Sequence, residues 1–182
     1  EFKNKDLKLL DACAAPGGKA FQLLSKNLNV TLNDKSKRKI QTLKSNLNRL
    51  KFNPKVLNKD FIKFDKNEKF DFIIIDAPCS AIGTIRKNPE IFFKSKIPDF
   101  DGLNNLQQNM LEKAALLLNV GGSILYMTCS FIKNETLDQI NEFLKNNNNF
   151  LVANFILKEE KYDFSKLVQN NLMITIPDKI LN

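Results

Sequence analysis

The 182-residue sequence contains no histidine, and this absence excludes the commonest forms of nucleophilic catalysis within these residues. Neither a Ser-His-Asp nor a Cys-His arrangement can form, and the remaining side chains are a poor ligand set for a catalytic zinc ion. Acid–base chemistry must therefore depend on Asp, Glu, Lys, Tyr or Cys.

Cysteines and long apolar stretches are also scarce. Three cysteines, an odd number, do not suggest a disulfide framework, so a reducing cytoplasm is the default location. The apolar runs are too short to cross a bilayer, and the first residues lack the charged-then-apolar pattern of a secretion signal. We therefore expect a cytoplasmic protein with no membrane partner and no metal ion.

What the chain does contain is typical of a globular protein with a basic surface. It is 43% hydrophobic and long enough for one domain with a real core, so we expect residues 1–182 to form a single domain. The net charge of +8 favours a polyanionic partner such as RNA. The chain is rich in Lys and Asn throughout, however, and charge alone does not distinguish a binding surface from a general bias in composition.

Short apolar runs alternate with helical patterns along the chain, and this alternation predicts a parallel sheet covered on both faces. The glycines Gly121 and Gly122 are predicted to end the third helix. The predicted strands cover residues 8–12, 30–33, 55–58, 70–75, 123–128 and 150–156, with a possible further strand at 172–176. The predicted helices cover residues 19–27, 36–51, 103–119 and 134–145.

All three cysteines follow predicted strands, and the central one lies in the segment D-A-P-C-S of residues 76–80. Ligands of open α/β sheets bind at the carboxyl ends of the strands, so Cys13, Cys79 and Cys129 should meet at one edge of the sheet. A free cysteine is more often a small apolar residue than a catalyst. Two cysteines in the settings P-C-S and T-C-S nevertheless indicate a thiolate that acts on a substrate.

The first predicted strand enters a turn of small residues, which lets the backbone approach a ligand closely. Asp34 ends the second strand, where carboxylates hold ribose hydroxyls in dinucleotide folds, and Asp60 follows the third strand. These features indicate a cofactor that contains a nucleoside. The alternative is a tight turn with two solvated carboxylates.

Residues 81–100 form a long irregular stretch, and a stretch of this length is usually functional or mobile. It carries four basic residues close to the cysteine segment, and we expect these to contact RNA: Arg86, Lys87, Lys94 and Lys96.

Three motifs, D-A-C-A-A-P-G-G-K, D-A-P-C-S-A-I-G-T-I-R-K-N-P-E and Y-M-T-C-S, resemble those of the Sun/Nop family of RNA cytosine-5 methyltransferases. The resemblance is to the catalytic domain of the bacterial members that methylate small-subunit (16S) ribosomal RNA, and it covers residues 9–140. It implies a Rossmann-like class I methyltransferase fold with a mostly parallel, doubly wound sheet, and S-adenosyl-L-methionine as the cofactor.

The resemblance also implies roles for single residues. Cys129 matches the family nucleophile, Cys79 matches the cysteine that assists product release, and Asp76 would lie between the cofactor and the cytosine ring. Asp34 would hold the cofactor ribose and Asp60 would lie near the adenine. The residues that would line the methionine and ribose of the cofactor are Cys13, Ala14, Ala15, Pro16, Gly17, Gly18 and Lys19.

Two departures from the family pattern and several alternatives remain. After T-C-S the family usually has a proline and two acids, whereas Lys133-Asn134-Glu135 keeps one acid, in a segment that we do not expect to be catalytic. The family also has an N-terminal RNA-binding region and a last C-terminal strand, and we expect these residues to lack both. The alternatives are the same reaction on transfer RNA and a non-catalytic RNA-binding or ribosome-assembly module; a monomer is the default oligomeric state.

Overall fold

The computed structural model describes residues 6–93, 97–153, 168–169 and 172–173 of the chain. The chain divides into two compact units, residues 1–139 and 140–182, and each is described by itself.

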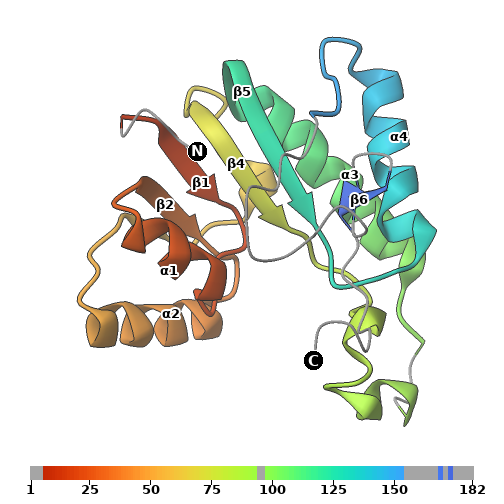
Figure 1. Ribbon diagram of the computed structural model, residues 1–182, viewed down its shortest axis with the longest axis horizontal. Coiled ribbons are helices and arrows are strands. Elements are labelled where there is room, and N and C mark those ends of the chain that lie inside the picture. The colour runs from red at the N-terminus through yellow and green to blue at the C-terminus, as the bar shows by residue number, and fades with distance from the viewer. Residues whose placement is uncertain (1–5, 94–96, 154–167, 170–171, 174–182) are drawn as a thin grey trace. The chain divides into compact units, whose positions relative to one another are not determined.

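The first unit is built on a five-stranded sheet with the strand order β3-β2-β1-β4-β5, in which every pairing is parallel (Figure 1). The chain moves outward from β1 in one direction to β3, then returns and moves from β4 to β5 in the other direction. Right-handed crossovers therefore place the two groups of helices on opposite faces. This confirms the predicted doubly wound parallel sheet. Its strands are β1 (Lys8–Asp11), β2 (Asn29–Asn33), β3 (Val56–Leu57), β4 (Phe70–Asp76) and β5 (Leu118–Met127).

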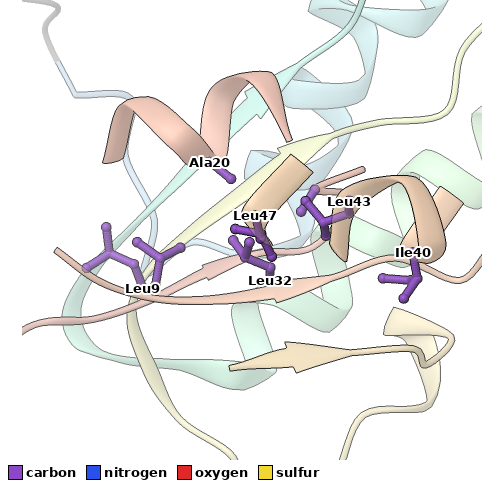
Figure 2. Close-up of a cluster of buried hydrophobic side chains, with 8 residues drawn as sticks. Leu9, Ala20, Leu32, Ile40, Leu43 and Leu47 are labelled. Carbon is purple, nitrogen blue, oxygen red and sulfur yellow. The ribbon is translucent and has the colours of Figure 1, made fainter. Parts of the chain in front are cut away.

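The helices α1 (Gly18–Ser25) and α2 (Lys37–Leu50) pack beside β1 and β2. The α2 helix begins where the Ser36 side chain accepts a hydrogen bond from the Lys39 backbone. Its apolar residues recur at helical spacing and are buried against the sheet. Figure 2 shows this cluster, in which the labelled side chains are Leu9, Ala20, Leu32, Ile40, Leu43 and Leu47.

The helix α3 (Phe100–Leu117) packs beside β4 and β5. Asp99 caps its first turn by accepting a hydrogen bond from the Gly102 backbone at 2.9 Å. Lys113 is buried, and its ammonium group donates to the Phe64 carbonyl. The buried residues of α3 are Gln107, Met110, Leu111, Lys113, Ala114 and Leu117.

The prediction that Gly121 and Gly122 end the third helix is wrong. The helix ends at Leu117 and the chain enters β5 at Leu118, so both glycines lie inside the strand. The register of pairing between β4 and β5 shifts between Phe70 and Phe72, and Gly121 adopts a positive φ of 78° near this irregularity. Glycine tolerates that conformation, so the pair marks a bulge rather than a helix terminus.

The predicted helix at 134–145 is α4 (Leu137–Asn146), which follows a 3₁₀ turn, η4 (Lys133–Glu135). The sixth predicted strand is wrong for residues 150–153, which form no strand. Phe150 instead donates a backbone hydrogen bond to Asn147 in a turn and packs edge-to-face on Phe143, with 5.1 Å between ring centroids. Residues 154–156 lie outside the described residues. In the second unit, the strands β6 (Val168–Gln169) and β7 (Leu172–Met173) pair antiparallel, and β7 covers part of the predicted strand at 172–176.

Candidate active site

The predicted site residues of the first unit come from segments that follow β1, β2, β3, β4 and β5 at their carboxyl ends. The topology reverses between the adjacent strands β1 and β4, and open α/β sheets bind their ligands in the crevice outside such a switch point. The fold therefore provides the location that the sequence predicted.

Cys79 and Cys129 meet at this edge, with their sulfur atoms 3.2 Å apart. Cys129 is exposed, whereas Cys79 is half-buried. The hydrogen bond from Cys79 lowers the pKa of Cys129 to about 7, while burial and the charge of Asp76 act in the opposite direction. The same hydrogen bond, together with burial, raises the pKa of Cys79. The pair therefore consists of an accessible thiolate and a thiol that donates to it.

Cys13 does not join this pair within the part of the chain that the structure describes. It is half-buried after β1, and burial raises the pKa of its thiol to about 12. The expectation that the three cysteines lie at one edge of the sheet is thus correct, since they follow the parallel strands β1, β4 and β5, but the printed sulfur contact joins Cys79 and Cys129 alone among the described residues. The raised pKa makes the Cys13 thiol a poor nucleophile.

Gly83 fixes the backbone at Cys129. Its amide donates to the Cys129 carbonyl at 2.9 Å, and it belongs to the 3₁₀ turn η2 (Ile82–Thr84). A Cβ atom at this position would lie 2.8 Å from that carbonyl oxygen, which is closer than real Cβ contacts. The segment that follows Cys79 therefore approaches Cys129 closely because residue 83 has no side chain.

Glu135 is fully buried and joins the segments that carry the two thiols. Its carboxylate accepts hydrogen bonds from the Ser80 backbone at 2.7 Å, from the Ser80 hydroxyl at 2.6 Å and from the Gln107 amide at 3.3 Å. Burial alone would raise the pKa of Glu135, but hydrogen bonds from Ser130, Ser80 and Gln107 outweigh it, so the pKa lies below its usual value. We name these four side chains, Ser80, Gln107, Ser130 and Glu135, the Glu135 clamp.

Further contacts hold the Glu135 clamp to its surroundings. The Gln107 amide also donates to the Pro78 carbonyl at 2.9 Å, and the Tyr126 hydroxyl donates to the Glu135 carbonyl at 2.9 Å. The sequence led us to expect that the segment of Glu135 is not catalytic, and it did not predict this buried contact. The only signal in the sequence was one acid that remained from the family pattern.

The turn after β1 forms the other half of the site. The Lys19 ammonium group lies 2.5 Å from the Asp76 carboxylate, so α1 is tied to the end of β4. Gly17 caps α1 with a φ of 117°, and a Cβ atom there would collide with the Phe21 ring. A Cβ atom on Gly18 would meet nothing within 4 Å, so there is open space beside this backbone. A ligand can approach the turn closely.

Asp34 and Asp60 lie at the ends of neighbouring strands, as predicted, and both carboxylates already have protein partners. Asp34 accepts from the Ser36 backbone at 2.8 Å. Asp60 forms an ion pair with Lys35 at 2.9 Å, and the hydrogen bond from this lysine lowers the pKa of Asp60. A ligand at Asp60 would therefore compete with Lys35 or share the carboxylate with it.

Two buried polar residues of this edge were missed. Asn33 bonds the Ala12 carbonyl, the Lys59 carbonyl and the Lys59 amide, each at 3.1 Å. Asp11 is buried at the end of β1, and burial raises its pKa to about 7 although the Cys13 amide donates to it. The sequence offers no periodicity that marks either residue, because each is the last residue of a strand of ordinary pattern.

The predicted RNA contacts are only partly described. Arg86 and Lys87 are exposed between η2 and η3 (Pro89–Phe93), whereas Lys94 and Lys96 lie outside the described residues. Among the described residues, no group of three or more His, Cys, Asp or Glu side chains could hold a metal ion, and no helix is long and apolar enough to cross a membrane.

Comparison with known proteins decides the family. The model of the 16S rRNA methyltransferase RsmB/F family matches residues 1–179 of the chain. The chain belongs to this family.

Curated relatives carry the same description. The ribosomal RNA small subunit methyltransferase B of Shewanella oneidensis is 40% identical over 141 residues, which cover 75% of this chain and 33% of that protein. The protein of the same name from Xanthomonas campestris is 36% identical over 146 residues, which cover 76% of this chain and 33% of that protein. The chain thus spans about a third of the length of these relatives.

Solved structures support the fold. NSun6 from Pyrococcus horikoshii, determined with SFG, superposes with a TM-score of 0.70 at 28% identity, covering 78% of this chain and 38% of that one. A methyltransferase homologue from the same organism gives a TM-score of 0.64 at 29% identity, covering 77% and 45%. These findings confirm the predicted family and the Rossmann-like class I fold. The roles of single residues stay predictions.

Proposed function

We propose that this chain carries the catalytic centre of an enzyme that methylates carbon 5 of a cytosine in ribosomal RNA, with S-adenosyl-L-methionine as the methyl donor. The observation that carries the proposal is the contact between the sulfur atoms of the exposed Cys129 and of Cys79, 3.2 Å apart at the carboxyl ends of β4 and β5, beside the switch point of the sheet. The family membership and the names of the relatives supply the substrate class.

Cys129 would act as the nucleophile. Carbon 5 of cytosine is a weak nucleophile by itself, and attack of a thiolate on carbon 6 makes the ring enamine-like, so that carbon 5 can accept a methyl group. A pKa of about 7 leaves a large fraction of Cys129 as thiolate at neutral pH, and its exposure leaves it accessible to a base. The target cytosine must be unpaired or flipped out of its stack to reach it.

Asp76 and Cys79 would complete the reaction. A protonated carboxyl group beside ring nitrogen 3 would stabilise the negative charge that develops there during the attack. The proton on carbon 5 must then leave before Cys129 can be expelled, and Cys79 is close enough to Cys129 to take part in this step. The ion pair between Lys19 and Asp76 orients the carboxylate before any substrate binds.

The turn after β1 would hold the methyl donor, which supplies an electrophilic methyl group when it is bound. The open space beside Gly18 and the positive φ of Gly17 fit a ligand that lies against the backbone. Asp34, at the end of β2, is placed as a ribose-binding carboxylate. Binding can be tested by calorimetry, in which Asp34→Ala should weaken the heat signal of the cofactor.

The two thiols should fail in different ways when RNA and cofactor are present. Cys129→Ser should abolish methyl transfer, because a hydroxyl group is a far weaker nucleophile than a thiolate. Cys79→Ser should still attack and methylate, but it should release the product slowly and stay covalently bound to RNA. The assay uses labelled total RNA, a denaturing gel and mapping of the methylated nucleotide.

The outcomes of this assay are distinct. A shifted band for Cys79→Ser alone supports Cys129 as the nucleophile and Cys79 as the releasing group, and a band for Cys129→Ser alone would reverse these roles. Methylation that persists in both variants would show that neither thiol attacks the base. Mapping to transfer RNA would keep the reaction and replace the substrate.

A further inference from the structure

The positive charge of the chain is concentrated in one segment. Residues 35–59 contain nine of the 28 Lys and Arg residues and none of the 20 Asp and Glu residues. The rest of the chain therefore has 19 basic and 20 acidic residues, so a lysine bias spread evenly over the chain does not explain the net charge of +8. The nine residues are Lys35, Lys37, Arg38, Lys39, Lys44, Arg49, Lys51, Lys55 and Lys59.

All nine side chains are exposed, and most lie on α2 or at its ends. Within the described residues, only Lys35 and Lys59 form ion pairs, with Asp60 at 2.9 Å and with Glu68 at 3.9 Å. The seven others form no ion pair in that part of the chain. Because the buried side of α2 faces the sheet, its outer side is a basic surface. We name this surface the α2 face; its exposed cations are Lys37, Arg38, Lys39, Lys44 and Arg49.

Three cations of the α2 face lie where cations are unfavourable, in the first turn of a helix. The first turn of α2 contains Lys37, Arg38 and Lys39 and no acid, although the positive end of the helix dipole disfavours cations there. Positions that break a local preference without a compensating contact are often functional. An anionic partner would supply the missing compensation.

We propose that the α2 face binds the sugar-phosphate backbone of RNA, an inference that rests on the proposed function. Uncharged polar side chains lie between the cations, and such groups also bond to phosphates and sugars. The first turn of α2 follows Asp34 at the end of β2, at the same edge of the sheet as Cys79 and Cys129 (Figure 1). RNA that reaches the thiols can continue along this helix.

The test compares two triple variants of the chain. The first, Arg38→Gln, Lys44→Gln and Arg49→Gln, removes three charges from the α2 face with a good helix-forming residue. The control, Lys26→Gln, Lys66→Gln and Lys145→Gln, removes three exposed charges elsewhere. Binding of a labelled single-stranded RNA of mixed sequence is measured by fluorescence anisotropy between 50 and 300 mM KCl. Thermal unfolding and cofactor calorimetry are measured on the same samples.

We expect the α2 variant to reduce the slope of log affinity against log salt by about 2, since each phosphate contact to a single strand contributes about 0.7. If the variant and the wild type bind RNA equally at 1 M salt, where these charge contacts no longer contribute, a slope lower by about 2 makes the variant bind about 100-fold more weakly than the wild type at 0.1 M. The control should change the slope by much less. Equal effects of the two variants, an unchanged slope in the α2 variant, or a wild type that binds no RNA at 50 mM KCl would overturn the proposal. A wild type that binds no cofactor would instead contradict the proposed function.

A separate observation, the Glu135 clamp, carries a second inference. Ser80, the neighbour of Cys79, bonds the buried carboxylate through its backbone amide and its hydroxyl group. Ser130, the neighbour of Cys129, lies with its hydroxyl oxygen 3.3 Å from that of Ser80 and helps to lower the pKa of Glu135. Gln107 ties this carboxylate to α3 and to the Pro78 carbonyl. We infer that Glu135 is a positioning residue, which acts on the reaction by keeping the two thiols in contact.

Oxidation by diamide measures this contact without RNA or cofactor. The Cys79 and Cys129 thiols lose two protons and two electrons to diamide, which becomes the hydrazine form, and a disulfide joins the two sulfur atoms. Glu135→Gln keeps the size and one carbonyl acceptor, whereas Glu135→Ala removes every acceptor. Ser80→Ala removes only one tether and provides a milder variant.

Because small displacements of reacting groups reduce rates steeply, we expect Glu135→Ala to form the disulfide at least about tenfold more slowly than the wild type. Glu135→Gln should stay within about threefold, and Ser80→Ala should lie between the two. Thermal unfolding shows whether each variant is folded at the assay temperature. Equal rates in the wild type and in the folded variants, or a wild type that forms no disulfide, would overturn the inference.

Discussion

The pH dependence of Cys129 alkylation is the most direct test of the candidate active site, because it needs neither RNA nor cofactor. The hydrogen bond from Cys79 lowers the pKa of Cys129 from an ordinary 9.0 to about 7. At pH 7 about half of Cys129 is then thiolate, against about 1% for an ordinary thiol. Cys79→Ala removes the donor, and the inflection of the rate profile should move from about 7 toward 9.

The change in rate is smaller than the change in thiolate fraction. A thiolate with a lower pKa is intrinsically less nucleophilic, and a Brønsted coefficient of about 0.4–0.5 makes it about six- to tenfold slower over two pKa units. At pH 7 the loss of thiolate in Cys79→Ala, about 50-fold, is therefore reduced to about five- to eightfold slower alkylation. At pH 10 Cys129 is mostly thiolate in both proteins, and it should react faster in the variant than in the wild type. The two profiles should cross.

The assay follows iodoacetamide labelling of the Cys129 peptide by mass spectrometry between pH 5 and pH 10. Cys13→Ala is the matched control, because it removes a thiol without touching the pair, and its profile should match the wild type. The reasoning fails if the wild type titrates near pH 9, or if Cys79→Ala leaves the inflection in place.

Three further predictions concern residues that support the site. Burial raises the pKa of Asp11 to about 7, so the folded state keeps a proton that the unfolded chain loses near pH 4, and the stability of the protein falls as the pH rises from about 4 through 7. In urea unfolding, Asp11→Asn should raise the free energy of unfolding by up to about 4 kcal/mol at pH 8 and change it little at pH 4. Equal gains at both pH values would contradict this explanation. In the same assay, Gly17→Ala should lower the free energy of unfolding by about 1–3 kcal/mol, because residue 17 has a positive φ and its new Cβ atom would collide with the Phe21 ring. Gly18→Ala should not destabilise the protein, because its Cβ atom would meet no other atom, and similar losses in the two variants would refute this distinction. Gly83→Ala should displace the Cys129 backbone and raise the inflection of its alkylation profile, and an unaltered profile would show that the close approach is unimportant.

Most of the fold could be predicted from the sequence because local pattern determines it. The apolar runs before Asp11, Asn33 and Asp76 are short and bounded, and the helical spacing of α2 has a single interpretation. The failures occurred where a local signal has two meanings. A glycine pair can end a helix or form a bulge, and the apolar residues 150–153 could form a strand or a packed turn.

For the candidate site, the positions of the residues could be predicted from the sequence, but their contacts could not. Strand ends could be placed from the sequence, so the meeting of Cys79 and Cys129 was predictable. The partners of these strand ends were not, because the contacts join residues far apart in the chain. Ser80 and Glu135 are 55 positions apart, and Lys19 and Asp76 are 57 apart. Nothing in a single sequence pairs such positions.

The side chain of Asn33 has a consequence for the thermodynamics of ligand binding. It bonds backbone groups after β1 and after β3, so the segments that follow three neighbouring strands form one hydrogen-bonded unit before any ligand arrives. A ligand that binds at this part of the edge finds its polar groups already ordered, and little conformational entropy remains to be lost on association. When a nucleoside binds at this edge, little of the favourable binding enthalpy should therefore be offset by a loss of conformational entropy in the chain.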